Sequence, residues 1–152
     1  YDMRIVIQRV SRASVSIAGE TVSSIQGGML ILLGVEQDDT AEDVAWLVKK
    51  AAQLRIFDDA DGVMNLDVVR TAGEALVVSQ FTLHASTKKG NRPSYIKAAG
   101  EDVAVPLYEL FISELGKAIG RNVAAGKFGA DMQVELVNDG PVTIIIDSKN
   151  KE

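Results

Sequence analysis

The sequence has 152 residues, with no cysteine and a single histidine, His84. Without cysteine it has no disulfide, no thiolate zinc site and no cysteine nucleophile, and one histidine cannot form a multi-histidine metal site within the chain. No apolar run approaches the ~20 residues of a membrane span, and the N-terminus lacks the pattern of a secretory signal peptide. We therefore expect a cytoplasmic protein with no metal, no cofactor and no membrane partner.

The length predicts one domain, because single cores commonly run to about 100–200 residues. We interpret Met3 as the natural first residue and Tyr1 and Asp2 as a remnant of the expression vector. The domain is expected to span residues 3–147, and residues 148–152 form a tail to which no role is assigned.

The net charge of −5 argues against general nucleic-acid binding, but the charge is unevenly distributed. Residues 85–100 and 115–130 carry seven basic residues and no acidic one, which leaves −12 on the other 120 residues. A basic pole on an acidic body can still bind a polyanion, since phosphate contacts are local. The alternative is that both segments are solvated loops with ordinary lysines.

Hydrophobic patterning predicts a mixed α/β fold. Strands are expected at residues 3–10, 14–17, 21–25, 29–35, 55–57, 74–83, 132–137 and 142–146. One helix is expected to begin near Thr40, with Asp43 completing a capping box, and a second carries Pro106 in its first turn. Because hairpins open and close the chain, we expect a largely antiparallel sheet and not a strict βαβ alternation.

Familiar catalytic constellations are missing. In an extended strand Thr82 and His84 face one side and Ser79 the other. No nearby carboxylate orients the His84 ring, so we expect a solvent-facing histidine at the entry to a loop and not a general base. No glycine-rich phosphate loop opens a helix.

Two segments are unusual. The first, Ser79-Gln80-Phe81-Thr82-Leu83, ends a buried strand with hydroxyls, an amide and backbone N–H groups that can stabilise an oxyanion, unless it is only a strand fraying into a loop. The second, residues 138–143, places Pro141 directly after an Asn-Asp-Gly turn, which removes a donor and restricts Gly140. The cis or trans state of the Gly140–Pro141 bond stays open.

At these two segments the sequence resembles the D-aminoacyl-tRNA deacylase family, and the resemblance runs from Met3 to about Ile146. The segments 90–94 and 128–133, the opening MRIVIQRVSRASV and the run LLGV also look like family motifs. The resemblance implies a curved, barrel-like, largely antiparallel sheet with two main helices. It also implies a homodimer with its sites at the subunit interface.

The activity implied by the resemblance is hydrolysis of the ester that joins a D-amino acid to the 3′ end of tRNA, as chiral proofreading. The resemblance also implies a catalytic segment of Ser79, Gln80, Phe81 and Thr82 from one subunit, with Gly140 and Pro141 of the other subunit excluding L side chains. Phe81 is expected to act through its backbone N–H, while the substrate's 2′-hydroxyl assists and a nucleophilic role for Thr82 stays open. Glycyl-tRNA is an expected side substrate, because glycine has no side chain to exclude.

The remaining matched positions concern the tRNA. Met3, Arg9, Phe128 and Met132 match family positions near the terminal adenosine, with core packing as the alternative for each. Lys88, Lys89 and Arg92 are expected to meet tRNA phosphates. The expected partners are tRNA and a second copy of the chain, and not DNA. A non-catalytic RNA-binding dimer and a sensor of free amino acids are the alternative functions.

Overall fold

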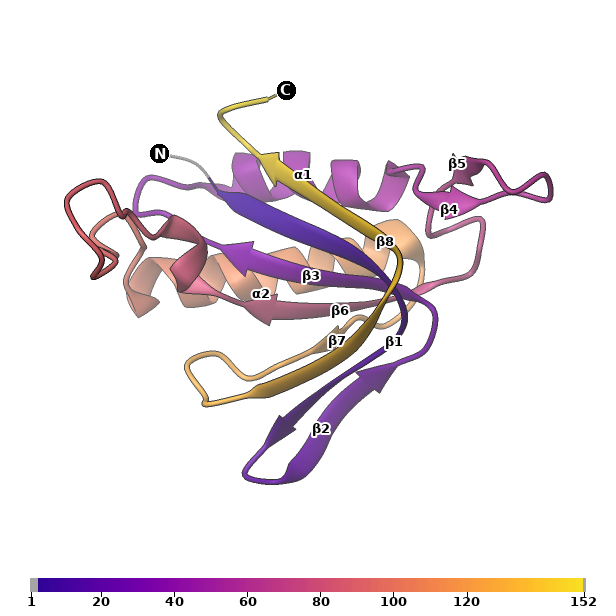
Figure 1. The fold of residues 1–152 in the computed structure, drawn as a ribbon. Coiled ribbons are helices and arrows are strands. Elements are labelled where there is room, and N and C mark those ends of the chain that lie inside the picture. Colours follow the sequence, from indigo (N-terminus) through magenta and orange to yellow (C-terminus); the bar gives the residue numbers. More distant parts are fainter. Residues whose placement is uncertain (1–2, 152) are drawn as a thin grey trace.

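A computed structural model describes residues 3–151, so the interpretation of Tyr1 and Asp2 lies outside the described residues. The main sheet has the order β2-β1-β3-β6-β7, with β8 paired to β1, and β4 and β5 form a small second sheet. Two helices cover one face of the main sheet (Figure 1). The elements are β1 (Arg4–Ile17), β2 (Glu20–Ile25), β3 (Gly28–Gly34), α1 (Ala41–Gln53), β4 (Phe57–Asp58), β5 (Met64–Leu66), β6 (Glu74–Ser79), the 3₁₀ turn η1 (Phe81–His84), α2 (Glu101–Ile119), β7 (Ala124–Ala125) and β8 (Gln133–Asp147).

The long strand β1 organises the sheet. Along one edge its first half pairs antiparallel with β3 and its second half with β2, while β8 pairs antiparallel along the other edge. The strands expected at 3–10 and 14–17 are therefore one strand. The expected hairpin with β2 is present, and Ala18 and Gly19 at its turn both have positive φ, as tight hairpin turns require.

Two further strands are added in parallel. β6 pairs parallel with β3, and β7 pairs parallel with β6, with α1 and α2 in the respective crossovers. The sheet curls until β2 approaches β7, where the Ser23 hydroxyl donates to the Ala125 carbonyl at 2.9 Å. The mixed, largely antiparallel and barrel-like fold expected from the sequence is confirmed.

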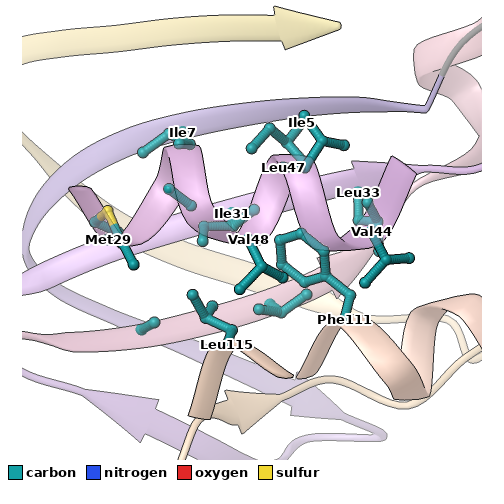
Figure 2. Close-up of a cluster of buried hydrophobic side chains, with 14 of the residues drawn as sticks. Ile5, Ile7, Met29, Ile31, Leu33, Val44, Leu47, Val48, Phe111 and Leu115 are labelled. Atoms are coloured by element: carbon teal, nitrogen blue, oxygen red, sulfur yellow. The ribbon is translucent and has the colours of Figure 1, made fainter. Parts of the chain in front are cut away.

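The core has two parts, because β3 is buried on both faces as its apolar run predicts. Met29, Ile31 and Leu33 face the helices and pack with residues of α1 and α2 (Figure 2). Leu30 and the buried part of the second half of β1 face the interior of the curled sheet. A rigid two-sided layer therefore supports the ends of β3 and β6.

Helix α1 begins as predicted, after Thr40, with both halves of its capping box formed by Thr40 and Asp43. The prediction for Pro106 is wrong, since α2 begins at Glu101 and places the proline inside the helix, beyond the first turn. Among residues 3–151, no helix combines the length and hydrophobicity that crossing a membrane requires.

Strand β8 differs most from expectation, because its two halves pair with the same strand instead of closing a hairpin. Between the pairs Val10–Asn138 and Gln8–Thr143, the register shifts so that β8 has extra residues. These residues protrude as a loop that contains the Gly140–Pro141 peptide bond, which is cis. Pro141 has no N–H to donate to β1, and Val142 N donates instead to Asn138 Oδ1 at 3.1 Å.

The C-terminal tail packs against the body. Ser148 is buried, its hydroxyl accepts from Met3 N at 3.1 Å, and its own N–H donates to the Met3 carbonyl at 2.9 Å. Lys149 Nζ lies 3.2 Å from an Asp39 carboxylate oxygen. The tail therefore fastens the end of β8 beside the start of β1.

Candidate active site

Strand β6 ends at Ser79, and the chain then turns into η1, so the expectation of an extended strand to Leu83 is wrong. The last sheet-like contact is Gln80 N, which donates to the Leu33 carbonyl at 2.8 Å. β3 itself ends at Gly34, the residue after Leu33. Beyond Gln80, the chain that follows β6 therefore has no residue of β3 beside it with which to pair. The tight turn redirects Thr82 and His84, so their side chains do not follow the alternation of an extended strand.

A cavity of about 370 Å³ adjoins this turn. It is lined by two segments that the sequence singled out, namely Ser79, Gln80, Phe81 and Thr82 on one side, and Phe128 and Met132 on the other. The structure thus brings together six of the predicted site residues. In Figure 1, β6 and the chain leading into β8 approach each other on the left of the sheet.

Residues 79–82 include two backbone N–H groups that lie before the internal hydrogen bonds of η1. The first internal hydrogen bond of η1 runs from Leu83 N to the Gln80 carbonyl at 3.2 Å, so the N–H groups of Phe81 and Thr82 precede it, as at any helix start. The Thr82 hydroxyl accepts from Gln80 Nε2 at 3.0 Å. Backbone N–H groups such as those of Phe81 and Thr82 can hold a carbonyl oxygen as negative charge develops on that oxygen.

The prediction of a solvent-facing His84 without a carboxylate neighbour is wrong. The residue is 4% exposed, and its Nδ1 lies 3.2 Å from Oε1 of the buried Glu36. Its Nε2 is also buried and has no hydrogen-bond partner among the described residues. The ring therefore faces the interior and does not serve the exposed Thr82 hydroxyl as a base.

Tyr108 supports the side of the cavity that is lined by Phe128. Its ring packs against that of Phe128, with 5.9 Å between centroids, and its hydroxyl donates to the Val77 carbonyl at 3.2 Å. Burial raises the pKa of Tyr108 to about 12, so the hydroxyl stays protonated and keeps this bond at neutral pH.

The Gly140–Pro141 loop does not line this cavity within one chain. It lies beside Arg9, which pairs with Met29 near the start of β3, whereas Ser79 pairs with Leu33 near the other end. Met29 and Leu33 are four residues apart, so the two regions are separated by roughly 13 Å along β3. In Figure 1 the bend of β8 accordingly lies on the right of the sheet.

Arg9 and Met3 are also away from the cavity. The Arg9 guanidinium is buried, with Nε donating to the Asp139 carbonyl at 3.0 Å and Nη1 to the Ile56 carbonyl at 2.8 Å. It therefore holds the loop that carries Gly140. The Met3 side chain is fully buried in the core, which agrees with the alternative that Met3 serves core packing. It therefore has no exposed surface with which to contact RNA.

The predicted phosphate-binding residues Lys88, Lys89 and Arg92 are exposed in the loop that follows η1. Reciprocal hydrogen bonds of 2.8 Å between Ser86 and Ser94 close the base of this loop. Within residues 3–151 there is no group of three or more histidine, cysteine, aspartate or glutamate side chains arranged to hold a metal ion.

Two residues near the site were missed from the sequence. Glu36 is the buried partner of His84, and an acid directly after the apolar run 29–35 was the available signal. Tyr95 packs edge-on against the Phe81 ring, with 4.9 Å between centroids. It directly follows the family-like segment 90–94, but no spacing rule connects it to Phe81.

The chain is similar to known proteins along nearly its whole length. The sequence matches the family described as D-Tyr-tRNA(Tyr) deacylase over residues 6–147. A protein of Bacteroides thetaiotaomicron named D-aminoacyl-tRNA deacylase is 63% identical over 150 residues, which cover 99% of this chain and 100% of the relative. A protein of the same name from Flavobacterium johnsoniae is 57% identical with the same coverage.

Solved structures show the same fold. One described as c-Myc DNA Unwinding Element Binding Protein superposes with a TM-score of 0.89 and 41% identity, covering 94% of this chain and 97% of the other. Another, described as a probable eukaryotic D-amino acid tRNA deacylase, has a TM-score of 0.84 at 18% identity and covers 97% of this chain and 100% of that one. At that lower identity the likeness concerns the fold alone.

Proposed function

The chain belongs to the D-Tyr-tRNA(Tyr) deacylase family, and from this membership and the site we infer that it is a hydrolase of D-aminoacyl-tRNA. The reaction breaks the ester between the amino acid and the terminal ribose. Water supplies the hydroxyl group of the new carboxyl on the free D-amino acid and the proton that restores the ribose hydroxyl of the tRNA. The observation that carries this assignment is the cavity shared by residues 79–82 with Phe128 and Met132.

We propose that the Phe81 N–H binds the ester carbonyl oxygen. In the tetrahedral intermediate this oxygen carries negative charge, and a fixed N–H near it stabilises the transition state more than the substrate. An aminoacyl ester is already activated compared with an amide, so little further assistance is needed. The 2′-hydroxyl of the terminal ribose lies next to the ester and positions or activates the attacking water.

The apolar side of the cavity suits the terminal adenosine. Phe128 offers an aromatic face and Met132 a polarisable thioether, and both kinds of side chain pack well on a base. For Met3 and Arg9 the burial described above favours structural roles over contact with the nucleotide. The exposed Lys88, Lys89 and Arg92 then meet phosphates of the tRNA, which makes binding weaken with salt.

We propose a homodimer in which the Gly140–Pro141 loop of one subunit enters the cavity of the other. The separation of the two segments within one chain supports this arrangement. So does β8, which pairs with β1 alone among the described strands and exposes Val134, Val137 and Ile145. An apolar strand with a free edge is a surface that a second chain can cover.

In this arrangement the loop captures the amino group of the substrate and excludes side chains of L configuration. Because it does not bind the D side chain itself, the enzyme accepts several D-amino acids. Glycyl-tRNA is a side substrate on the same reasoning. We place the activity in the cytoplasm, where aminoacyl-tRNA is made and used.

The alternatives are a non-catalytic RNA-binding dimer and a sensor of free amino acids. One solved structure with the same fold is named for binding a DNA element, which supports considering nucleic-acid binding without turnover. Release of D-tyrosine from D-tyrosyl-tRNA by purified protein distinguishes all three. Binding of the tRNA without release supports the first alternative, and binding of free D-tyrosine without tRNA supports the second.

A further inference from the structure

The buried pair of His84 and Glu36 lies directly behind the turn that carries Phe81 and Thr82. The two side chains are 2% and 3% exposed, and 3.2 Å separates His84 Nδ1 from Glu36 Oε1. A ring nitrogen facing a carboxylate oxygen at this distance carries its proton toward the oxygen. Burying two such groups is unfavourable unless they pair with good geometry, and here the pair joins η1 to the segment after β3.

Glu36 is itself held in place. Its backbone N–H donates to Asp39 Oδ2 at 2.6 Å, its carbonyl accepts from Asp39 N at 3.1 Å, and it forms a β-bridge with Ala98. The carboxylate therefore projects from a fixed segment of backbone. Through the contact with Nδ1, the last residue of η1 is fixed to that segment.

Gly34 allows the turn to pack directly on the end of β3. A Cβ at this position would lie 3.0 Å from both Cδ2 and Nε2 of His84, and 3.0 Å from the Leu83 Cβ. Contacts this short mean that even a methyl group would push the turn outward. The His84 ring thus rests on bare backbone on one side and meets Glu36 through its Nδ1.

The turn is fixed at both ends. At its start, Gln80 N donates to the Leu33 carbonyl at 2.8 Å, and near its end Arg4 Nη1 donates to the Leu83 carbonyl at 2.9 Å. Phe81 and Thr82 lie between these points, on the side that lines the cavity. Their orientation is set by the contacts on either side of them.

We propose that His84, held by Glu36, is a positioning residue for deacylation. Its role is to direct the Phe81 N–H into the cavity. The proposal rests on the proposed function, because it assigns the pair to that same reaction. Neither side chain contacts the substrate. A directional polar contact suits this task, since an oxyanion donor must sit within about 2.7–3.1 Å of the oxygen and a displacement of about 1 Å can cost 100-fold in rate.

The pair could instead serve stability alone, and the double variant Glu36→Leu/His84→Leu separates the two roles. Replacing both partners by apolar groups avoids leaving one of them buried without its partner, so the fold is expected to survive better than in either single variant. We expect single-turnover hydrolysis of D-tyrosyl-tRNA to fall at least tenfold in the double variant. The dissociation constant for the same tRNA should change less than threefold, because the tRNA contacts are untouched.

Three further variants complete the experiment. His84→Asn places an amide N–H near the position of Nδ1 and should recover the rate to within about threefold of wild type. Gly34→Ala should reproduce the rate loss while leaving the pair chemically intact. Leu47→Ala in α1 lowers the melting temperature without touching the turn, and at temperatures where it is folded it should turn over at the wild-type rate.

An independent readout is the backbone amide of Phe81, followed by nuclear magnetic resonance. In the double variant we expect increased motion of the Phe81 and Thr82 amides, with those of β6 unchanged. Wild-type rates together with an unchanged Phe81 amide would overturn the positioning role. If the wild-type protein itself hydrolyses no D-aminoacyl-tRNA, the proposed function fails, and the Phe81 amide alone decides whether the pair fixes the turn.

Discussion

Thr82 and Ser79 contribute the two side-chain hydroxyls that line the cavity, and the surroundings of the Thr82 hydroxyl argue against its use as a nucleophile. An alcohol needs a neighbouring base to attack an ester efficiently. The His84 ring faces Glu36 in the interior, and the group that contacts the hydroxyl is the Gln80 amide, which donates to it at 3.0 Å. An amide N–H directed at the hydroxyl oxygen does not remove a proton.

We therefore expect Thr82→Ala to retain deacylation within about tenfold of wild type, because the variant keeps the backbone N–H groups of η1. The measurement is single-turnover hydrolysis of D-tyrosyl-tRNA. The same assay on tRNA that lacks the terminal 2′-hydroxyl should show a large loss with the wild-type enzyme. A folded Thr82→Ala protein with no activity, together with normal cleavage of the 2′-deoxy substrate, would make Thr82 the nucleophile.

At the scale of elements, helix α1 depends on the ionised state of Asp43. Burial raises the pKa of this carboxyl, but hydrogen bonds from Ser148 and Thr40 and the charge of Lys149 outweigh burial and leave the pKa below its usual range. A carboxyl with a lowered pKa in the folded state stabilises the fold above its unfolded value, about 3.9. This contribution is lost as pH falls through the lower folded value.

Asp43→Asn should therefore lower the free energy of unfolding at pH 7 by about 1 kcal/mol, the usual size of a lost helix cap. The difference from wild type should shrink as the pH is lowered from about 4, because the wild-type carboxyl then becomes neutral as well. Urea unfolding at several pH values measures this. Glu42→Gln, an exposed change in the same helical turn, should have a smaller effect, and a difference for Asp43→Asn that stays constant with pH would contradict the assignment.

The start of β3 packs so closely on β6 that only glycine fits at position 28. A Cβ on Gly28 would overlap the backbone of Glu74, whereas one on Gly27 would meet nothing within 4 Å. Gly28→Ala should therefore cost about 1–3 kcal/mol, as overpacking a rigid site does, and Gly27→Ala should be nearly neutral. Thermal unfolding of the two variants compares them directly, and equal melting temperatures would show that the strands can separate without cost.

The elements that the sequence predicted well are those whose pattern is local. The apolar run 29–35 predicted a strand buried on both faces, and Thr40 with Asp43 predicted the start of α1. The failures depend on partners that are distant in the chain. β6 stops at Ser79 because β3 ends beside it, and β8 does not fold back because β1 is long enough to pair with both of its halves.

The same distinction applies to the site. Residues 79–82 were identified because hydroxyls and an amide end a buried strand. The family motifs brought in Phe128, Met132 and Gly140–Pro141. The interior position of His84 was not foreseeable, since Glu36 is 48 positions away in the chain and no local pattern connects them. Burial of Met3 likewise depends on core residues that are distant in the chain, while Ser148 of the tail hydrogen-bonds the Met3 backbone.

At the scale of the whole molecule, we propose that the two halves of the site come from different subunits. A mixed dimer tests this, with Phe81→Pro in one chain, which removes the N–H, and Gly140→Val in the other. If each cavity takes its loop from the partner, one of the two sites in the mixed dimer has both segments intact. Part of the activity should then return, although each variant alone is inactive.

Sites formed within single chains would leave the mixed dimer as inactive as its parents. The mass in solution provides the control, since the protein should sediment at twice 16.3 kDa at micromolar concentration.

We propose that the protein hydrolyses aminoacyl-tRNA with selection for D configuration by exclusion of the L side chain. Single-turnover hydrolysis of D-tyrosyl-tRNA and L-tyrosyl-tRNA by the same purified protein tests it most directly. We expect the D ester to be cleaved at least 100-fold faster, a ratio that corresponds to about 2.7 kcal/mol in the transition state. Equal rates on the two esters, or release of neither amino acid, would contradict it.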